Sequence, residues 1–187
     1  GSSEATDTIN FVVNPIVFTQ AFLPGSKLGV NYTSATSITL ALYAPFKEYV
    51  YVLGDFNDST VNTDYFMKRD ADNATWWITI SGLEAGKKYA FQYLVDGDIK
   101  IADPYSALVL DPNNDKYIDA ARYPNPHPYP DGKTSGYATL IEMDNTPYAW
   151  QVTDFEAPEE NELIVYELLV RDFVAKHNYA TILDSLD

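Results

Sequence analysis

Short segments with alternating apolar and polar side chains set the strongest limit on how this chain can fold. In residues 36–44, 75–81 and 88–95, large apolar residues recur at every second position, which is the period of a strand with one buried face. The side chains expected on the buried faces are Ile38, Leu40, Leu42, Trp76, Ile78, Ile80, Tyr89, Phe91, Tyr93 and Val95. Evenly spaced strands without helices between them pack as two layers, so the pattern predicts an all-β sandwich.

Turn residues separate these strands from further short strand candidates. The additional candidates are residues 16–20, 28–33 and 49–53. Asp96 and Gly97 predict a hairpin turn, because this pair favours positive φ. We expect a loose polar tail over residues 1–10 and an immunoglobulin-like sandwich over residues 11–121.

The sequence changes character after the predicted sandwich. Proline stands at alternate positions within residues 123–130, which predicts an extended strap, and we assign residues 122–161 to this linker. Residues 163–170 are almost continuously apolar, as in a parallel strand buried on both faces. Residues 178–186 carry apolar side chains at helical spacing. Strand followed by helix indicates that residues 162–187 begin a β/α unit.

Composition excludes several classes of function. Twelve Lys and Arg against 27 Asp and Glu give a formal net charge of −15, which disfavours nucleic-acid binding. The absence of Cys excludes disulfides and thiolate chemistry. No apolar run is long enough to cross a membrane, and the first residues do not form a signal peptide. We expect a secreted or cell-envelope protein from which a signal has been removed, with a cytoplasmic location left open.

Several motifs occur in an order that is similar to one family of proteins. They are VYVLGDFND at 50–58, WWITISGLEAGKKYAFQYLVDG at 76–97, ADPYS at 102–106, LDPNNDKY at 110–117, YPNPHPYPDGKTSG at 123–136 and IVYELLVRDF at 164–173. The earlier motifs resemble the early-set β-sandwich that precedes the barrel in pullulanases, isoamylases and branching enzymes. They also resemble the glycogen-binding module of the AMP-activated kinase β subunit. The last motif resembles the first barrel strand of alpha-amylase family glycoside hydrolases.

This resemblance implies a parent enzyme with a (β/α)8 barrel that cleaves α-glucosidic linkages with retention. Such chemistry needs two carboxylates, and in this family both lie on later barrel strands, beyond residue 187. No catalytic residue is therefore assigned here, and Glu167 is interpreted as structural. The expected role is a non-catalytic module that buttresses the barrel in starch or glycogen metabolism. The alternative is a carbohydrate-binding module with genuine α-glucan affinity.

The resemblance also indicates where a glucan would bind. In the glycogen-binding relatives two Trp residues form a platform, but here Ser59 and Ile99 stand at those positions, and Gln92 replaces a basic residue. Neither Ser nor Ile can stack on a sugar face as a ring does. Asn57 and Trp77 remain as carbohydrate-binding candidates. Trp77 points away from the predicted core, where it could contact the strap, the barrel or a sugar.

The sequence also allows predictions about metal ions and binding partners. Four oxygen-bearing residues could hold calcium or simply form turns: Asp111, Asn113, Asn114 and Asp115. The Glu that closes an EF-hand loop is absent, so we assign no metal and no cofactor, and leave calcium to the parent enzyme. The expected partners are an α-glucan, reached through the parent enzyme, and the protein's own catalytic barrel. Residues 162–187, without their barrel neighbours, are expected to self-associate.

Overall fold

The computed structural model describes residues 15–146 and 148–186. The predicted tail of residues 1–10 lies outside the described residues. The chain divides into two compact units. The first, here called the sandwich unit, holds the described residues up to Asp115 together with residues 127–145. The second, here called the C-terminal unit, holds residues 116–126 and the described residues from 146 onward.

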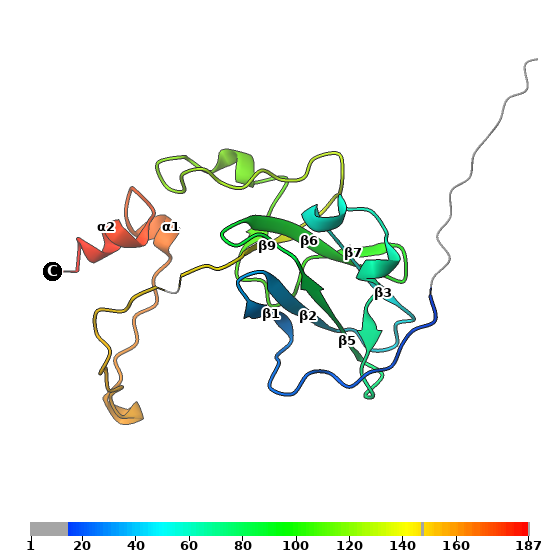
Figure 1. The fold of residues 1–187 in the computed structure, drawn as a ribbon. Helices are drawn as coiled ribbons and strands as arrows, with labels where there is room; N and C mark the ends of the chain where they lie inside the picture. The colour runs from blue at the N-terminus through cyan, green and yellow to red at the C-terminus, as the bar shows by residue number, and fades with distance from the viewer. Residues whose placement is uncertain (1–14, 147, 187) are drawn as a thin grey trace, which may run out of the picture. The chain divides into compact units, whose positions relative to one another are not determined.

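The sandwich unit consists of two antiparallel sheets (Figure 1). The first sheet has the order β1 (Gly29–Ser34), β2 (Ser37–Tyr43), β5 (Thr75–Ser81) and β4 (Lys68–Arg69). The second has the order β3 (Val50–Gly54), β6 (Lys88–Val95), β9 (Ala138–Glu142) and β8 (Val109–Leu110), with β7 (Ile99–Ile101) also paired to β6. The prediction of an all-β sandwich is confirmed.

The core lies between the two sheets and contains every side chain predicted for it. All ten of the predicted inward residues belong to one buried cluster, and none is more than 6% exposed. Trp76 is the largest of them, and its indole N–H donates to the carbonyl of Ala44 at 3.0 Å. Period-two alternation therefore identified the buried faces of β2, β5 and β6 correctly.

Two features of the sandwich differ from the prediction. Strand β9 lies within the segment interpreted as strap, and it pairs with both β6 and β8. The sandwich unit therefore extends past residue 121, because residues 88–91 of β6 would otherwise lack this backbone partner. Residues 16–20 do not form a strand and contribute one isolated bridge, between Thr19 and Arg69.

Short helical turns occupy the connections of the sandwich unit and the C-terminal unit. They are η1 (Asp55–Asn57), η2 (Thr63–Tyr65), η3 (Asp115–Tyr117), η4 (Glu160–Glu162), α1 (Val170–Phe173) and α2 (Tyr179–Leu183). The Asn178 side chain caps α2 by accepting from the Thr181 N–H at 2.8 Å. Residues 163–169 form no strand, because no described strand lies alongside to pair with them. Within the described residues, no helix has the length and apolar character needed to cross a membrane.

Candidate functional site

The GDFN turn at residues 54–57 is fixed by its own backbone and by Asn57. The Asn57 side chain accepts from the Gly54 N–H and donates to the Val52 carbonyl, both at 2.8 Å. Gly54 must lack a side chain, because an added Cβ would lie 2.7 Å from the Phe56 ring and 2.8 Å from the Ala90 carbonyl oxygen. The Asp55 carboxylate accepts from the Ala90 N–H at 2.7 Å and so ties the turn to β6. The amide of Asn57 is thus engaged in holding the turn.

Gln92 lies on the outer face of the second sheet and is covered by the chain itself. Only 2% of the residue is exposed. Its amide nitrogen donates to the carbonyls of Ser135 and Tyr137 at 2.9 and 2.7 Å, and its amide oxygen accepts from the Thr134 hydroxyl. All three of these hydrogen bonds are made with residues 134–137, which we call the covering loop. Nothing outside the chain is needed to satisfy this amide.

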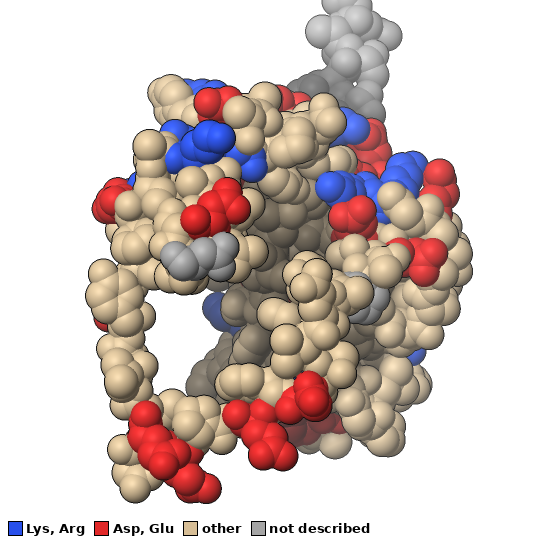
Figure 2. All heavy atoms as spheres, turned by 90° about the vertical axis from the view of Figure 1, so that its left-hand side faces the viewer, with Lys and Arg blue, Asp and Glu red and all other residues tan. Residues whose placement is uncertain are grey.

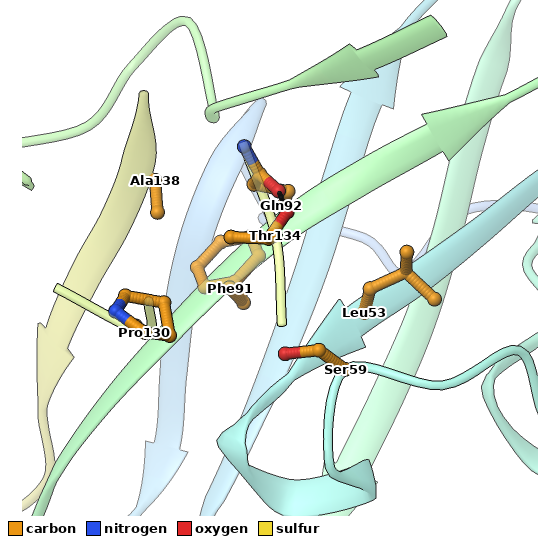
Figure 3. Close-up of a pocket in the computed structure, with 8 residues that line it drawn as sticks. Leu53, Ser59, Phe91, Gln92, Pro130, Thr134 and Ala138 are labelled. Carbon is orange, nitrogen blue, oxygen red and sulfur yellow. Dashed lines mark hydrogen bonds between the residues drawn. The ribbon is translucent and has the colours of Figure 1, made fainter. Parts of the chain in front are cut away.

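A small hollow remains beneath the covering loop (Figure 3). Leu53, Ser59, Phe91, Pro130 and Thr134 are among the residues that line it. Its volume is about 10 Å³, close to what one water molecule needs and far too small for a sugar ring. Lys133 adds an exposed ion pair with Asp58 at the rim. The outer face around Gln92 is therefore closed in this structure.

The two positions expected to carry stacking rings lie where the resemblance places them. Ser59, with φ of 54°, follows the GDFN turn and lines the hollow. Ile99 begins β7 directly after the hairpin turn and is 40% exposed. Neither side chain offers an aromatic face toward Gln92, so the apolar platform of a stacking site is missing here.

Trp77 lies on the outer face of the other sheet, away from the core. It is only 2% exposed, and its indole N–H donates to the Gln20 carbonyl at 2.9 Å. The Phe22 ring packs against it with centroids 6.1 Å apart, and the Lys68 ammonium lies 4.6 Å from its ring centroid. A sugar could reach this ring only if those groups moved. As sugar-binding residues, Trp77 and Asn57 stay predictions, and the structure does not bring them together in one accessible site.

A comparison with known families places these motifs in one module. Residues 27–113 match the family described as carbohydrate-binding module 48, the isoamylase N-terminal domain. Residues 27–113 are thus similar to a family 48 module. Two 1,4-alpha-glucan branching enzymes of Clostridium perfringens are each 31% identical to this chain over 83 residues, which is 43% of the chain. That stretch is 11% of each relative, so this chain spans only a small part of their length.

Solved structures of similar proteins include the catalytic module of the pneumococcal glycogen-degrading protein SpuA. It is 24% identical and has a TM-score of 0.39, with coverage of 51% of this chain and 15% of that one. A pullulanase from Bacillus acidopullulyticus is 28% identical with a TM-score of 0.33, over 46% of this chain and 10% of that one.

The acidic turn at the end of the matched region uses its oxygens internally. Asp111 accepts from the backbone N–H groups of Asn113 and Asn114 at 2.8 and 3.3 Å, and also from the Asn114 side chain. Asp115 accepts from the Asp111 N–H at 2.8 Å. These bonds lower the pKa of Asp111 and are those of an Asx turn. The described residues contain no group of three or more His, Cys, Asp or Glu arranged to hold a metal ion.

Charged side chains are dispersed over the part of the chain that Figure 2 draws. Figure 2 shows acidic side chains at several separate places on the face it draws, with basic side chains among them. One acid is different, because Asp103 is only 3% exposed and burial raises its pKa. It accepts from the Tyr93 hydroxyl and from the Tyr105 N–H, each at 2.7 Å. Sequence reasoning did not single out Asp103, although its place in the ADPYS motif was a usable signal.

Proposed function

We propose that this chain is the non-catalytic N-terminal region of an α-glucan-acting enzyme and that its sandwich supports a catalytic domain. The observation that carries the proposal is the family 48 module whose outer face around Gln92 is closed by the covering loop. A module whose polar group on this face is already satisfied gains little from a sugar hydroxyl there. The names of the branching-enzyme relatives support an α-glucan as the substrate of the parent enzyme.

Binding measurements test this proposal directly. Calorimetry with maltoheptaose, or affinity electrophoresis in glycogen, should detect weak binding or none by the full chain. A dissociation constant in the low micromolar range, roughly −8 kcal/mol, would contradict it. The same chain should release no reducing sugar from starch, glycogen or pullulan, because retaining hydrolysis needs a carboxylate pair that sequence reasoning assigns beyond residue 187.

The second candidate function is genuine α-glucan binding through the family 48 face. The family match itself favours it. On this view the covering loop opens, and Ser59 and Ile99 are the positions that limit affinity. The double variant Ser59→Trp with Ile99→Trp should then gain glucan affinity, whereas under the support function the covering loop keeps the face closed and the variant gains none.

A further inference from the structure

A second concave region lies at the edge of the sandwich unit, away from Gln92. We call it the edge groove. It runs between β1, the loop at residues 105–107 and β9, with a volume of about 150 Å³. Val30, Tyr32, Tyr105, Ser106, Ala107 and Leu140 are among the residues that line it. It shares no lining residue with the hollow beneath the covering loop.

Two tyrosine side chains are exposed at this groove. Tyr32 is 54% exposed and Tyr105 is 63% exposed, although both line the same concavity. Tyrosine brings a rigid apolar ring and a hydroxyl with few rotatable bonds, so it binds at a low cost in conformational entropy. Ile141, which is 3% exposed and belongs to the core between the sheets, supplies an apolar floor. The groove is thus aromatic at its rim and apolar at its base.

The buried carboxylate of Asp103 holds Tyr105 in place. Its Oδ1 accepts from the Tyr105 N–H at 2.7 Å, and the backbone N–H of Asp103 donates to the Thr139 hydroxyl at 2.7 Å. Tyr105 also packs against Gly29, where an added Cβ would lie 2.8 Å from the Tyr105 Cβ. A buried acid is costly unless its hydrogen bonds are satisfied, so this network is a rigid mount for an exposed ring.

The chemistry of the lining selects the class of ligand. The Ser106 hydroxyl donates to the Leu108 carbonyl at 2.9 Å and can still accept a hydrogen bond. Burial raises the pKa of Tyr32, although a backbone bond with Glu142 opposes the rise, so its phenol stays a neutral donor. Glu142 and the net charge of −15 disfavour an anion. Rings, hydroxyls and negative charge together fit a neutral polyhydroxylated ring.

We propose that the edge groove binds one pyranose ring of a neutral carbohydrate. The volume is about half of the roughly 300 Å³ at which pockets begin to take drug-sized ligands, so a single ring is the appropriate size. One ring on two tyrosines gives weak binding, with a dissociation constant on the order of 1 mM. The choice of α-glucan probes rests on the proposed function, but the groove itself does not involve the closed face around Gln92.

The test is an amide NMR titration of the full chain with maltotriose. We expect saturable shifts at residues 28–32, 105–107 and 139–141, with none at Gln92 or the covering loop. Tyr105→Ala should weaken binding roughly fivefold to tenfold, since one ring contact is lost. Alanine keeps the Cβ that packs on Gly29, and the side chain is exposed, so the variant should fold. Ala107→Trp fills the groove and should abolish the shifts with both tyrosines in place.

Tyr43→Ala is the matched control, because Tyr43 is 57% exposed on the same unit but does not line the groove. It should leave the affinity unchanged. Glucuronate should bind less well than glucose, and equal binding would overturn the charge argument. Absence of shifts in the groove would overturn this proposal and leave the proposed function standing. Shifts confined to Gln92 and the covering loop would overturn both.

Discussion

Strand β6 and residues 163–169 are both apolar runs, yet the first is buried in the structure and the second is exposed. Seven of the eight residues of β6 are buried, whereas most of residues 163–169 are exposed. β6 pairs with β3 along one edge and with β7 and β9 along the other, so its backbone groups have partners on both edges. Residues 163–169 have no strand beside them in the described chain. Apolar composition predicts burial, but only neighbouring strands turn the prediction into a sheet.

The largest expected effect concerns the exposed apolar residues 163–169. We expect the full chain to associate through residues 162–187, because Ile164, Val165 and Tyr166 are 97%, 86% and 76% exposed. Burying such side chains stabilises association by about 1.5–3 kcal/mol each. Light scattering should give a higher mass for the full chain than for a version ending at Glu160 at the same high concentration. Two monomers would show that the run stays solvated or folds back on its own chain.

A core truncation in β6 should lower the free energy of unfolding far more than a truncation in residues 163–169. Phe91 is 1% exposed and packs edge-on against Tyr93 with ring centroids 5.5 Å apart. Phe91→Ala should lower the free energy of unfolding by about 3–5 kcal/mol, measured by urea denaturation. Ile164→Ala, at a fully exposed position, is the control and should change it by less than about 0.5 kcal/mol. Equal losses would mean that Ile164 is buried in solution.

We expect an intermediate loss of stability when the hydrogen bonds between Gln92 and the covering loop are removed. Gln92→Ala removes the partner of the Ser135 and Tyr137 carbonyls and should cost about 1–3 kcal/mol in urea denaturation. Thr134→Val removes only the hydroxyl that donates to Gln92, and should cost less. Hydrogen exchange in residues 133–137 should rise in both variants, more strongly in Gln92→Ala. If neither variant changes exchange there, Gln92 does not hold the covering loop closed.

The smallest expected effect is the pH dependence contributed by Asp103. Burial raises its pKa above the ordinary value of 3.8, against the opposing bonds from Tyr93 and Tyr105. Between 3.8 and the raised pKa the folded protein binds more protons than the unfolded chain, so this carboxyl lowers stability as pH rises through that window. Asp103→Asn should remove the fall. The stability difference between variant and parent, followed by urea denaturation from pH 3 upward, should therefore shift in favour of the variant as pH increases.

The sequence was sufficient to predict β5 and β6 to the residue, because alternation, a clear start and a turn coincide in both. It was not sufficient for β9. Its residues 138–142 do contain apolar Leu140 and Ile141, but they follow a long proline-rich segment, which dominated the interpretation. For residues 163–170 a strand was predicted from apolar composition alone, but a strand forms only where neighbouring strands pair with it. The pattern that predicts a strand is local in the sequence, whereas the strand that pairs with it can lie far away along the chain.

For the candidate site, the sequence predicted which residues stand at the expected positions but not what those residues contact. Ser59, Ile99 and Gln92 could be located by their spacing from the GDFN and VDG motifs. What covers Gln92 could not, since its partners are backbone carbonyls 43 and 45 residues away, which any residue could supply. The same holds for Trp77, whose indole is bonded to a carbonyl 57 residues earlier. Tertiary backbone contacts of this kind leave no compositional signal.

The place of β9 in the second sheet has a consequence for synthesis on the ribosome. β3 and β6 can pair as soon as residue 95 has emerged, but residues 88–91 of β6 wait for Ala138–Glu142. At roughly 5–20 residues per second, the nascent chain spends some seconds with that edge open. During this interval the half-built sheet is a template for pairing with another nascent chain, and a chaperone that shields it would raise the yield of folded protein.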